Sequence, residues 1–103
     1  MKSPSTRLGL AIATAWLAGH AGLASAQQTI TAGQTFYQKV CAKCHEAGIG
    51  PVLLGRGLPP EAFQYFVRHG SGPMPAFRVT DIDDATLKEL AQYLSTSKAP
   101  AGK

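Results

Sequence analysis

The stretch Cys41-Ala42-Lys43-Cys44-His45 constrains this chain more than any other part of its sequence. In a helix, Cys44 and His45 follow Cys41 by three and four residues, so the three side chains project from one side of about a single turn. Two thiols at this spacing, followed directly by a histidine, are the attachment signature of c-type haem. The motif therefore predicts one covalent haem c, with thioether bonds to Cys41 and Cys44 and with His45 as an iron ligand.

Three other interpretations of the motif have less support in the sequence. A thioredoxin-like redox disulfide needs a βαβ context, and no alternating strand pattern lies near Cys41. A structural zinc site needs four ligands, and beyond the cysteines only His45 and His69 remain after residue 26. The third alternative is two ordinary helix cysteines. Haem is favoured because the motif coincides with a secretory context, in which c-type haem is attached.

The first 26 residues have the pattern of a secretory signal peptide. Lys2 and Arg7 supply a basic start, residues 8–18 form a short apolar run, and residues 24–26 read Ala-Ser-Ala, an A-x-A cleavage site. The apolar run falls short of the ~20 residues that span a bilayer. We therefore predict cleavage after Ala26, a periplasmic location and no membrane anchor.

Residues 27–103 are predicted to form a single domain. Of the 10 basic residues, Lys2 and Arg7 precede residue 27, so eight remain against six acidic residues and the net charge is +2. This charge is too small and too dispersed for a nucleic-acid-binding protein. A chain of this size buries little apolar area, and small domains usually need a disulfide, metal or cofactor for stability. We therefore expect the haem-free chain to fold poorly.

The first predicted helix begins at Thr31 and runs toward Cys41. Thr31 and Gln34 have the spacing of a capping box. Gly33 lowers the helix propensity, which indicates either the close approach of another helix or a glycine tolerated near a helix end.

Two further helices are predicted downstream. One covers residues 60–69, with a proline in the first turn and Gly70 as its stop. The other begins at Asp83 and Asp84 and is an amphipathic helix with the i, i+3, i+4, i+7 pattern. Its apolar stripe consists of Leu87, Leu90, Ala91 and Leu94.

The glycine- and proline-rich residues 47–60 are predicted to wrap around the haem as a loop. A ligating histidine needs an acceptor for its other ring nitrogen, and the carbonyl of Pro51 is the candidate partner of His45. Arg56 matches the carboxylate of a haem propionate, although a solvated surface arginine fits nearly as well. Phe63 and Phe66 are predicted to pack against the haem.

Met74 is the candidate for the second axial ligand of the iron. It is the only methionine after residue 26, and Pro73 and Pro75 restrict its backbone, so that a thioether is presented from a stiff loop. Methionine is a suitable haem ligand. The alternatives are a gap-filling core methionine and His69 as a rival ligand.

The motifs together resemble those of class I cytochrome c. The resemblance rests on Gly33 and Tyr37, the Cys41 to His45 motif, Gly50-Pro51, Met74-Pro75 and Leu90-x-x-Tyr93-Leu94. It implies an all-α fold, with helices and loops wrapped around one covalently bound haem and with the first and last helices crossing at the glycine and aromatic positions. It also implies His45 and Met74 as axial ligands and a chain that is not an enzyme by itself.

A narrower resemblance is to the small cytochrome c subunits of p-cresol methylhydroxylase and eugenol hydroxylase flavocytochromes. It rests on the stretches at residues 50–53, 55–59 and 74–77 and on Asp83-Asp84. It implies one-electron transfer from an FAD-containing flavoprotein that oxidises a 4-alkylphenol, and onward transfer to a soluble acceptor. Leu54, Pro60 and Gln64 replace more polar residues expected in the p-cresol subunit. The alternatives are a freely diffusing carrier and a haem sensor or enzyme with an open iron position.

Overall fold

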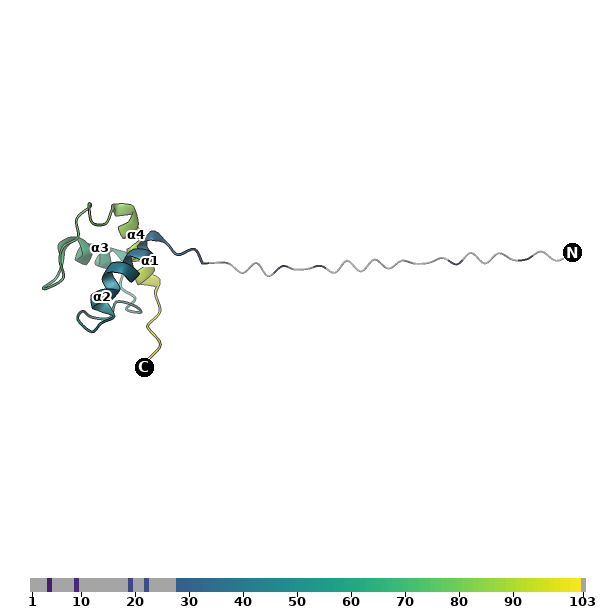
Figure 1. The fold of residues 1–103 in the computed structure, drawn as a ribbon, viewed down its shortest axis with the longest axis horizontal. Coiled ribbons are helices and arrows are strands. Elements are labelled where there is room, and N and C mark those ends of the chain that lie inside the picture. The colour runs from purple at the N-terminus through teal and green to yellow at the C-terminus, as the bar shows by residue number, and fades with distance from the viewer. Residues whose placement is uncertain (1–3, 5–8, 10–18, 20–21, 23–27, 103) are drawn as a thin grey trace.

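The computed structural model describes residues 28–102 together with Pro4, Gly9, Gly19 and Gly22. Apart from those four positions, the predicted signal peptide and its cleavage site after Ala26 lie outside the described residues. The elements form in the order α1 (Ala32–Phe36), a π-helical turn η1 (Tyr37–Cys41), α2 (Ala42–His45), α3 (Pro60–His69) and α4 (Asp84–Thr96). Figure 1 shows the helices gathered together with long loops between them. The described part of the chain is helical without a strand, which confirms the all-α prediction.

Helix α1 begins where the sequence predicts, because the Thr31 hydroxyl accepts a hydrogen bond from the N–H of Gln34 at 3.1 Å. The chain then stays helical through η1 and α2 to His45. The N–H of Ala42 donates to the carbonyl of Tyr37, five residues earlier, which widens this turn into a π-bulge. The haem motif thus spans the end of the wide turn and the whole of α2.

Helix α3 confirms the predicted bounds of 60–69. Pro59 is extended and Pro60 occupies the first turn, where a missing N–H costs no helical hydrogen bond. Gly70 ends the helix with a φ of 72°, a conformation that favours glycine. Phe63 and Val67 are the buried residues of α3, so they define its inward face.

Helix α4 is capped by Asp83. Its carboxylate accepts hydrogen bonds from the backbone N–H of Thr86 at 2.8 Å and from the Thr86 hydroxyl at 3.0 Å. The backbone hydrogen bond and then the hydroxyl hold the pKa of the Asp83 carboxyl below its ordinary value. The predicted stripe is confirmed, since the buried residues of α4 are Leu87, Leu90, Ala91 and Leu94.

Helices α1 and α4 cross with their backbones in close approach. A Cβ added to Gly33 would lie 2.7 Å from the Cα of Leu90 and 2.5 Å from the carbonyl carbon of Glu89, so only glycine fits there. The N–H of Gly33 donates to the Glu89 carboxylate at 3.1 Å. Beside this contact, the rings of Tyr37 and Tyr93 pack 5.6 Å apart. Of the two interpretations of Gly33, the structure therefore confirms close helix packing.

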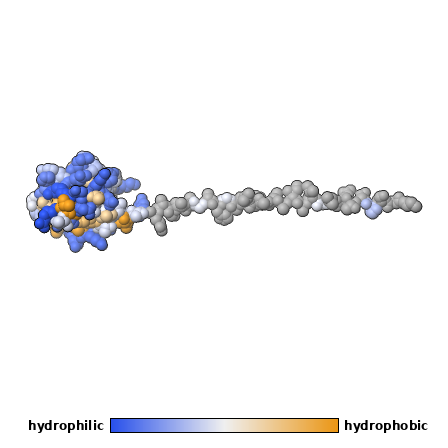
Figure 2. All heavy atoms as spheres, turned by 90° about the horizontal axis from the view of Figure 1, so that it is seen from above, coloured by the Kyte–Doolittle hydropathy of each residue, from blue (hydrophilic) through white to orange (hydrophobic). Residues whose placement is uncertain are grey.

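The hydrophobic core is built from buried residues of η1, α3 and α4 and from Ile82. Figure 2 shows apolar residues also reaching a surface that is otherwise largely hydrophilic. Within the described residues, no helix is long and apolar enough to cross a membrane. The buried apolar residues are Tyr37, Phe63, Val67, Ile82, Leu87, Leu90, Ala91 and Leu94.

Candidate functional site

Cys41 is the last residue of η1, and Cys44 and His45 are the last two residues of α2. Cys41 and His45 are half-buried, whereas Cys44 is exposed, and the two cysteines do not form a disulfide. Burial raises the pKa of the Cys41 thiol to about 11. The backbone N–H groups of Ile49 and Gly50 both donate to the carbonyl of Cys44, at 3.1 and 2.9 Å, and turn the chain back over His45.

The His45 ring is held by Pro51. Its Nδ1 lies 2.7 Å from the Pro51 carbonyl oxygen, as the sequence predicted. Because a carbonyl only accepts hydrogen bonds, Nδ1 carries the proton, and the lone pair of Nε2 is left for a metal. Gly50 lies against the same ring: a Cβ at this position would come within 2.8 Å of Nδ1 and 2.9 Å of Cε1. The loop therefore fixes both the tautomer and the position of the imidazole.

A cavity of about 470 Å³ borders His45. Neither cysteine nor Met74 lines it. Its walls are formed by Tyr37, His45, Glu46, Gly48, Gly50, Val52, Leu54 and Pro100.

The loop after Pro51 contacts the residues that follow α4. The N–H of Gly55 donates to the Ser97 hydroxyl oxygen at 3.0 Å, and a Cβ at Gly55 would lie 2.7 Å from the Cβ of Ala99. Arg56 is exposed, and its Nε donates to the Val52 carbonyl at 2.6 Å. Pairing of Arg56 with a haem propionate stays a prediction. The half-buried Leu53, Leu54 and Leu58 pack against the core.

Met74 lies in a tight turn that directly follows α3. Met74 and Ser71 exchange backbone hydrogen bonds of 3.0 and 3.1 Å, and Gly72 adopts a φ of 52° within this turn. The Met74 side chain is half-buried and packs against the core. The rival His69 is exposed, with Nδ1 2.8 Å from the Tyr65 carbonyl oxygen and its ring stacked on Tyr65 at 4.2 Å. His69 is thus held against its own helix.

The two phenylalanines predicted to pack against the haem lie in different surroundings. Phe63 is 4% exposed and belongs to the core cluster, whereas Phe66 is 45% exposed on α3. Their contact with haem stays a prediction.

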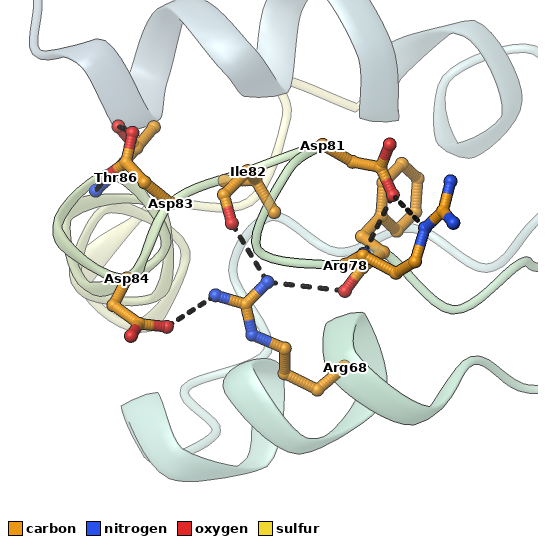
Figure 3. Close-up of polar contacts among 8 residues, drawn as sticks. Arg68, Arg78, Asp81, Ile82, Asp83, Asp84 and Thr86 are labelled. Atoms are coloured by element: carbon orange, nitrogen blue, oxygen red, sulfur yellow. Dashed lines mark hydrogen bonds and ion pairs between the residues drawn. The ribbon is translucent and has the colours of Figure 1, made fainter.

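Sequence reasoning missed two polar contacts around the site. The Tyr37 hydroxyl donates to the Glu46 carboxylate at 2.8 Å and links η1 to the residue that follows α2. Burial, and then the Glu46 hydrogen bond and charge, raise the pKa of Tyr37 above its ordinary range. Arg68 of α3 reaches both the segment after Met74 and the start of α4 (Figure 3). No periodicity or local motif signals either contact.

These residues fit a covalently attached haem. They provide two free thiols, an imidazole with Nε2 available, a thioether in a stiff turn and half-buried apolar loop residues. A zinc site does not fit, because no group of three or more His, Cys, Asp and Glu residues lies together in the described part of the chain.

Comparison with known proteins agrees with this chemistry. Residues 28–94 match the family described as "Cytochrome C oxidase, cbb3-type, subunit III". The chain is 46% identical over 85 residues to the cytochrome c subunit of 4-cresol dehydrogenase [hydroxylating] from Pseudomonas putida, covering 81% of this chain and 75% of that protein. It is also 29% identical over 75 residues to cytochrome c6 from Euglena viridis, covering 60% of this chain and 85% of that protein.

Solved structures show the same relationship. A chain in the crystal structure of p-cresol methylhydroxylase with substrate bound is 48% identical and superimposes with a TM-score of 0.61, covering 65% of this chain and 93% of that one. A second structure of p-cresol methylhydroxylase gives a TM-score of 0.59 at 48% identity, over 63% of this chain and 92% of that one. The chain therefore belongs to the cytochrome c family, as an electron-transfer cytochrome with covalently bound haem c.

Proposed function

We propose that this protein is a periplasmic one-electron carrier in which His45 and Met74 bind the haem iron from opposite faces. We further propose that it is the cytochrome subunit of a flavocytochrome and accepts electrons from an FAD-containing flavoprotein that oxidises 4-cresol or a related 4-alkylphenol. The haem supplies the one-electron redox chemistry. Cys41 and Cys44 would hold the haem, and His45 and Met74 would bind its iron and leave no coordination position open to a substrate.

The hydrogen bond between His45 and Pro51 carries the ligation proposal. The 2.7 Å contact leaves Nε2 as the free ring nitrogen, and a hydrogen-bonded imidazole is a more basic ligand. Met74 provides a sulfur from a turn closed by two backbone hydrogen bonds. A methionine ligand raises the reduction potential, which suits a haem that accepts electrons from a reduced flavin.

The flavoprotein partner is supported by similarity over most of the chain. The relative at 46% identity is named as the cytochrome c subunit of a 4-cresol dehydrogenase, and two structures of p-cresol methylhydroxylase contain a similar chain. Export is supported by the basic start, the apolar run and the A-x-A site in residues 1–26.

The ligation is tested by the absorption band at the red end of the oxidised spectrum that accompanies methionine ligation. We expect Met74→Ala to lose this band and to bind carbon monoxide in its reduced form. His69→Ala is the matched control, and its band should be unchanged if His69 is not a ligand. Ready binding of carbon monoxide by the reduced wild type would contradict six-coordination and support the open iron position of a sensor or enzyme.

The partner is tested by purification from the native host. We expect haem and FAD absorbance to elute together, and added 4-cresol to reduce the haem within this complex. Elution of the cytochrome as a monomer without FAD, at micromolar concentration, would instead support a freely diffusing carrier.

A further inference from the structure

The turn that carries Met74 is attached to α3 on both sides. Before Met74, the N–H of Gly70 donates to the Phe66 carbonyl at 2.7 Å. After Met74, the N–H of Phe77 donates to the Val67 carbonyl at 2.8 Å. The position of the Met74 sulfur therefore depends on how firmly residues 75–77 stay on α3.

Arg68 donates three hydrogen bonds, one to this returning segment and two to residues at the start of α4 (Figure 3). One guanidinium nitrogen, Nη1, donates to the carbonyls of Phe77 at 3.2 Å and Ile82 at 2.9 Å. The other, Nη2, pairs with the Asp84 carboxylate at 2.6 Å. The Arg68 side chain is 21% exposed, so its bonds to the two carbonyls are partly shielded from water, whereas the Asp84 side chain is 85% exposed.

Both backbone polar groups of Phe77 are hydrogen-bonded to α3. The Phe77 N–H donates to the Val67 carbonyl and the Phe77 carbonyl accepts from the Arg68 side chain, so two consecutive residues of α3 hold Phe77. Phe77 also packs edge-on against Phe36 of α1, with ring centroids 6.0 Å apart. Through Ile82 and Asp84, the same arginine sets where the chain enters α4. Arg68 thus holds the end of the segment 74–77 on α3 and ties it to the start of α4.

We propose that Arg68 is a positioning residue for Met74, which keeps residues 75–77 on α3 and so resists displacement of the methionine from the iron. This inference rests on the proposed ligation of iron by Met74. Lysine cannot replace arginine here, because its ammonium is a single point of donation and lacks the planar fork that reaches two carbonyls and a carboxylate together.

The test is a titration of the oxidised holoprotein with imidazole, which competes with methionine for the iron. We expect Arg68→Lys to bind imidazole at least about tenfold more tightly, since loss of one charge-assisted hydrogen bond is worth about 1.4 kcal/mol or more. Arg78→Lys is the matched control. Arg78 lies next to Phe77, but its side chain is 81% exposed and its ion pair with Asp81 measures 3.6 Å, so its affinity for imidazole should stay within about twofold of wild type.

Asp84→Asn provides a second variant that keeps both carbonyl contacts of Arg68. Its imidazole affinity should fall between those of wild type and Arg68→Lys. Native-state hydrogen exchange provides a second readout: the Phe77 amide should exchange faster in Arg68→Lys, while the Leu94 amide in α4 should keep its wild-type rate.

The inference is overturned if both variants bind imidazole within twofold of wild type, even if they unfold at a lower temperature, because Arg68 would then be structural only. A uniform rise in exchange at Phe77 and Leu94 would overturn it as well. If the wild type itself shows no methionine band, the proposed ligation fails, and the exchange rate of Phe77 still tests whether Arg68 holds the segment.

Discussion

Gly33 in α1 and Leu90 in α4 are in backbone contact, since a Cβ at position 33 would lie 2.7 Å from the Leu90 Cα. Alanine would overpack this crossing, and overpacking costs about 1–3 kcal/mol. At an exposed position inside a helix, replacing glycine by alanine instead raises the free energy of unfolding by about 1 kcal/mol. We therefore expect Gly33→Ala to lower the free energy of unfolding of the holoprotein in a denaturant titration. Gly102→Ala, where a Cβ meets nothing within 4 Å, is the control and should be neutral. A more stable Gly33→Ala would contradict the close packing.

Gly50 leaves room for the His45 ring. Alanine at position 50 would place its Cβ 2.8 Å from Nδ1, so we expect Gly50→Ala to move the ring and to cost about 1–3 kcal/mol of stability. Pro51→Ala keeps the carbonyl that accepts the proton of His45, and should cost less than about 1 kcal/mol, through chain entropy alone. NMR chemical shifts of the His45 ring separate the two variants. Similar ring shifts in both would show that Gly50 does not position the imidazole.

The Tyr37 hydroxyl is the buried donor to Glu46. Removing it in Tyr37→Phe should cost about 1 kcal/mol at neutral pH, because one hydrogen bond to an exposed carboxylate is lost. The pKa of Tyr37 is raised in the folded protein, so the unfolded chain loses this proton first, near pH 10. The contribution of Tyr37 is therefore complete below about pH 10 and decreases as the pH rises above it. Unfolding titrations from pH 8 to 11 should show a steeper loss of stability in wild type than in Tyr37→Phe. Parallel curves would contradict this.

Haem attachment should determine whether the domain folds. The core is small, and the half-buried Leu53, Leu54 and Leu58 cover it from a loop rich in glycine and proline. A chain with Cys41→Ala and Cys44→Ala should therefore lose most of its helical circular dichroism. Cys44→Ala alone retains one thioether site and should unfold at an intermediate temperature. Equal helicity and thermal stability in the double variant and the holoprotein would overturn this expectation.

Much of the fold could be predicted because its signals are local. The caps at Thr31 and Asp83, the stop at Gly70 and the stripe from Leu87 to Leu94 act within a few residues, so spacing alone reveals them. The hydrogen bond from His45 to Pro51 was also predictable, because its partners are six residues apart and a proline carbonyl is a ready acceptor.

The contacts that could not be predicted join distant residues. Glu89 accepts from the Gly33 N–H across 56 residues, and Ser97 accepts from the Gly55 N–H across 42. Nothing in the local sequence of a glutamate or a serine distinguishes these partners from solvent-exposed side chains. Arg68 likewise has the sequence context of an exposed helix residue, and its role depends on where the Met74 segment returns.

The crossing of α1 and α4 also has a consequence for the order in which the chain is made. Synthesis proceeds from the N-terminus, so Gly33 and the haem motif are synthesised before Glu89 and Leu90. Throughout that interval, the face of α1 that will meet α4 has no native partner. The docking of α4 is therefore the last native contact to become available to α1.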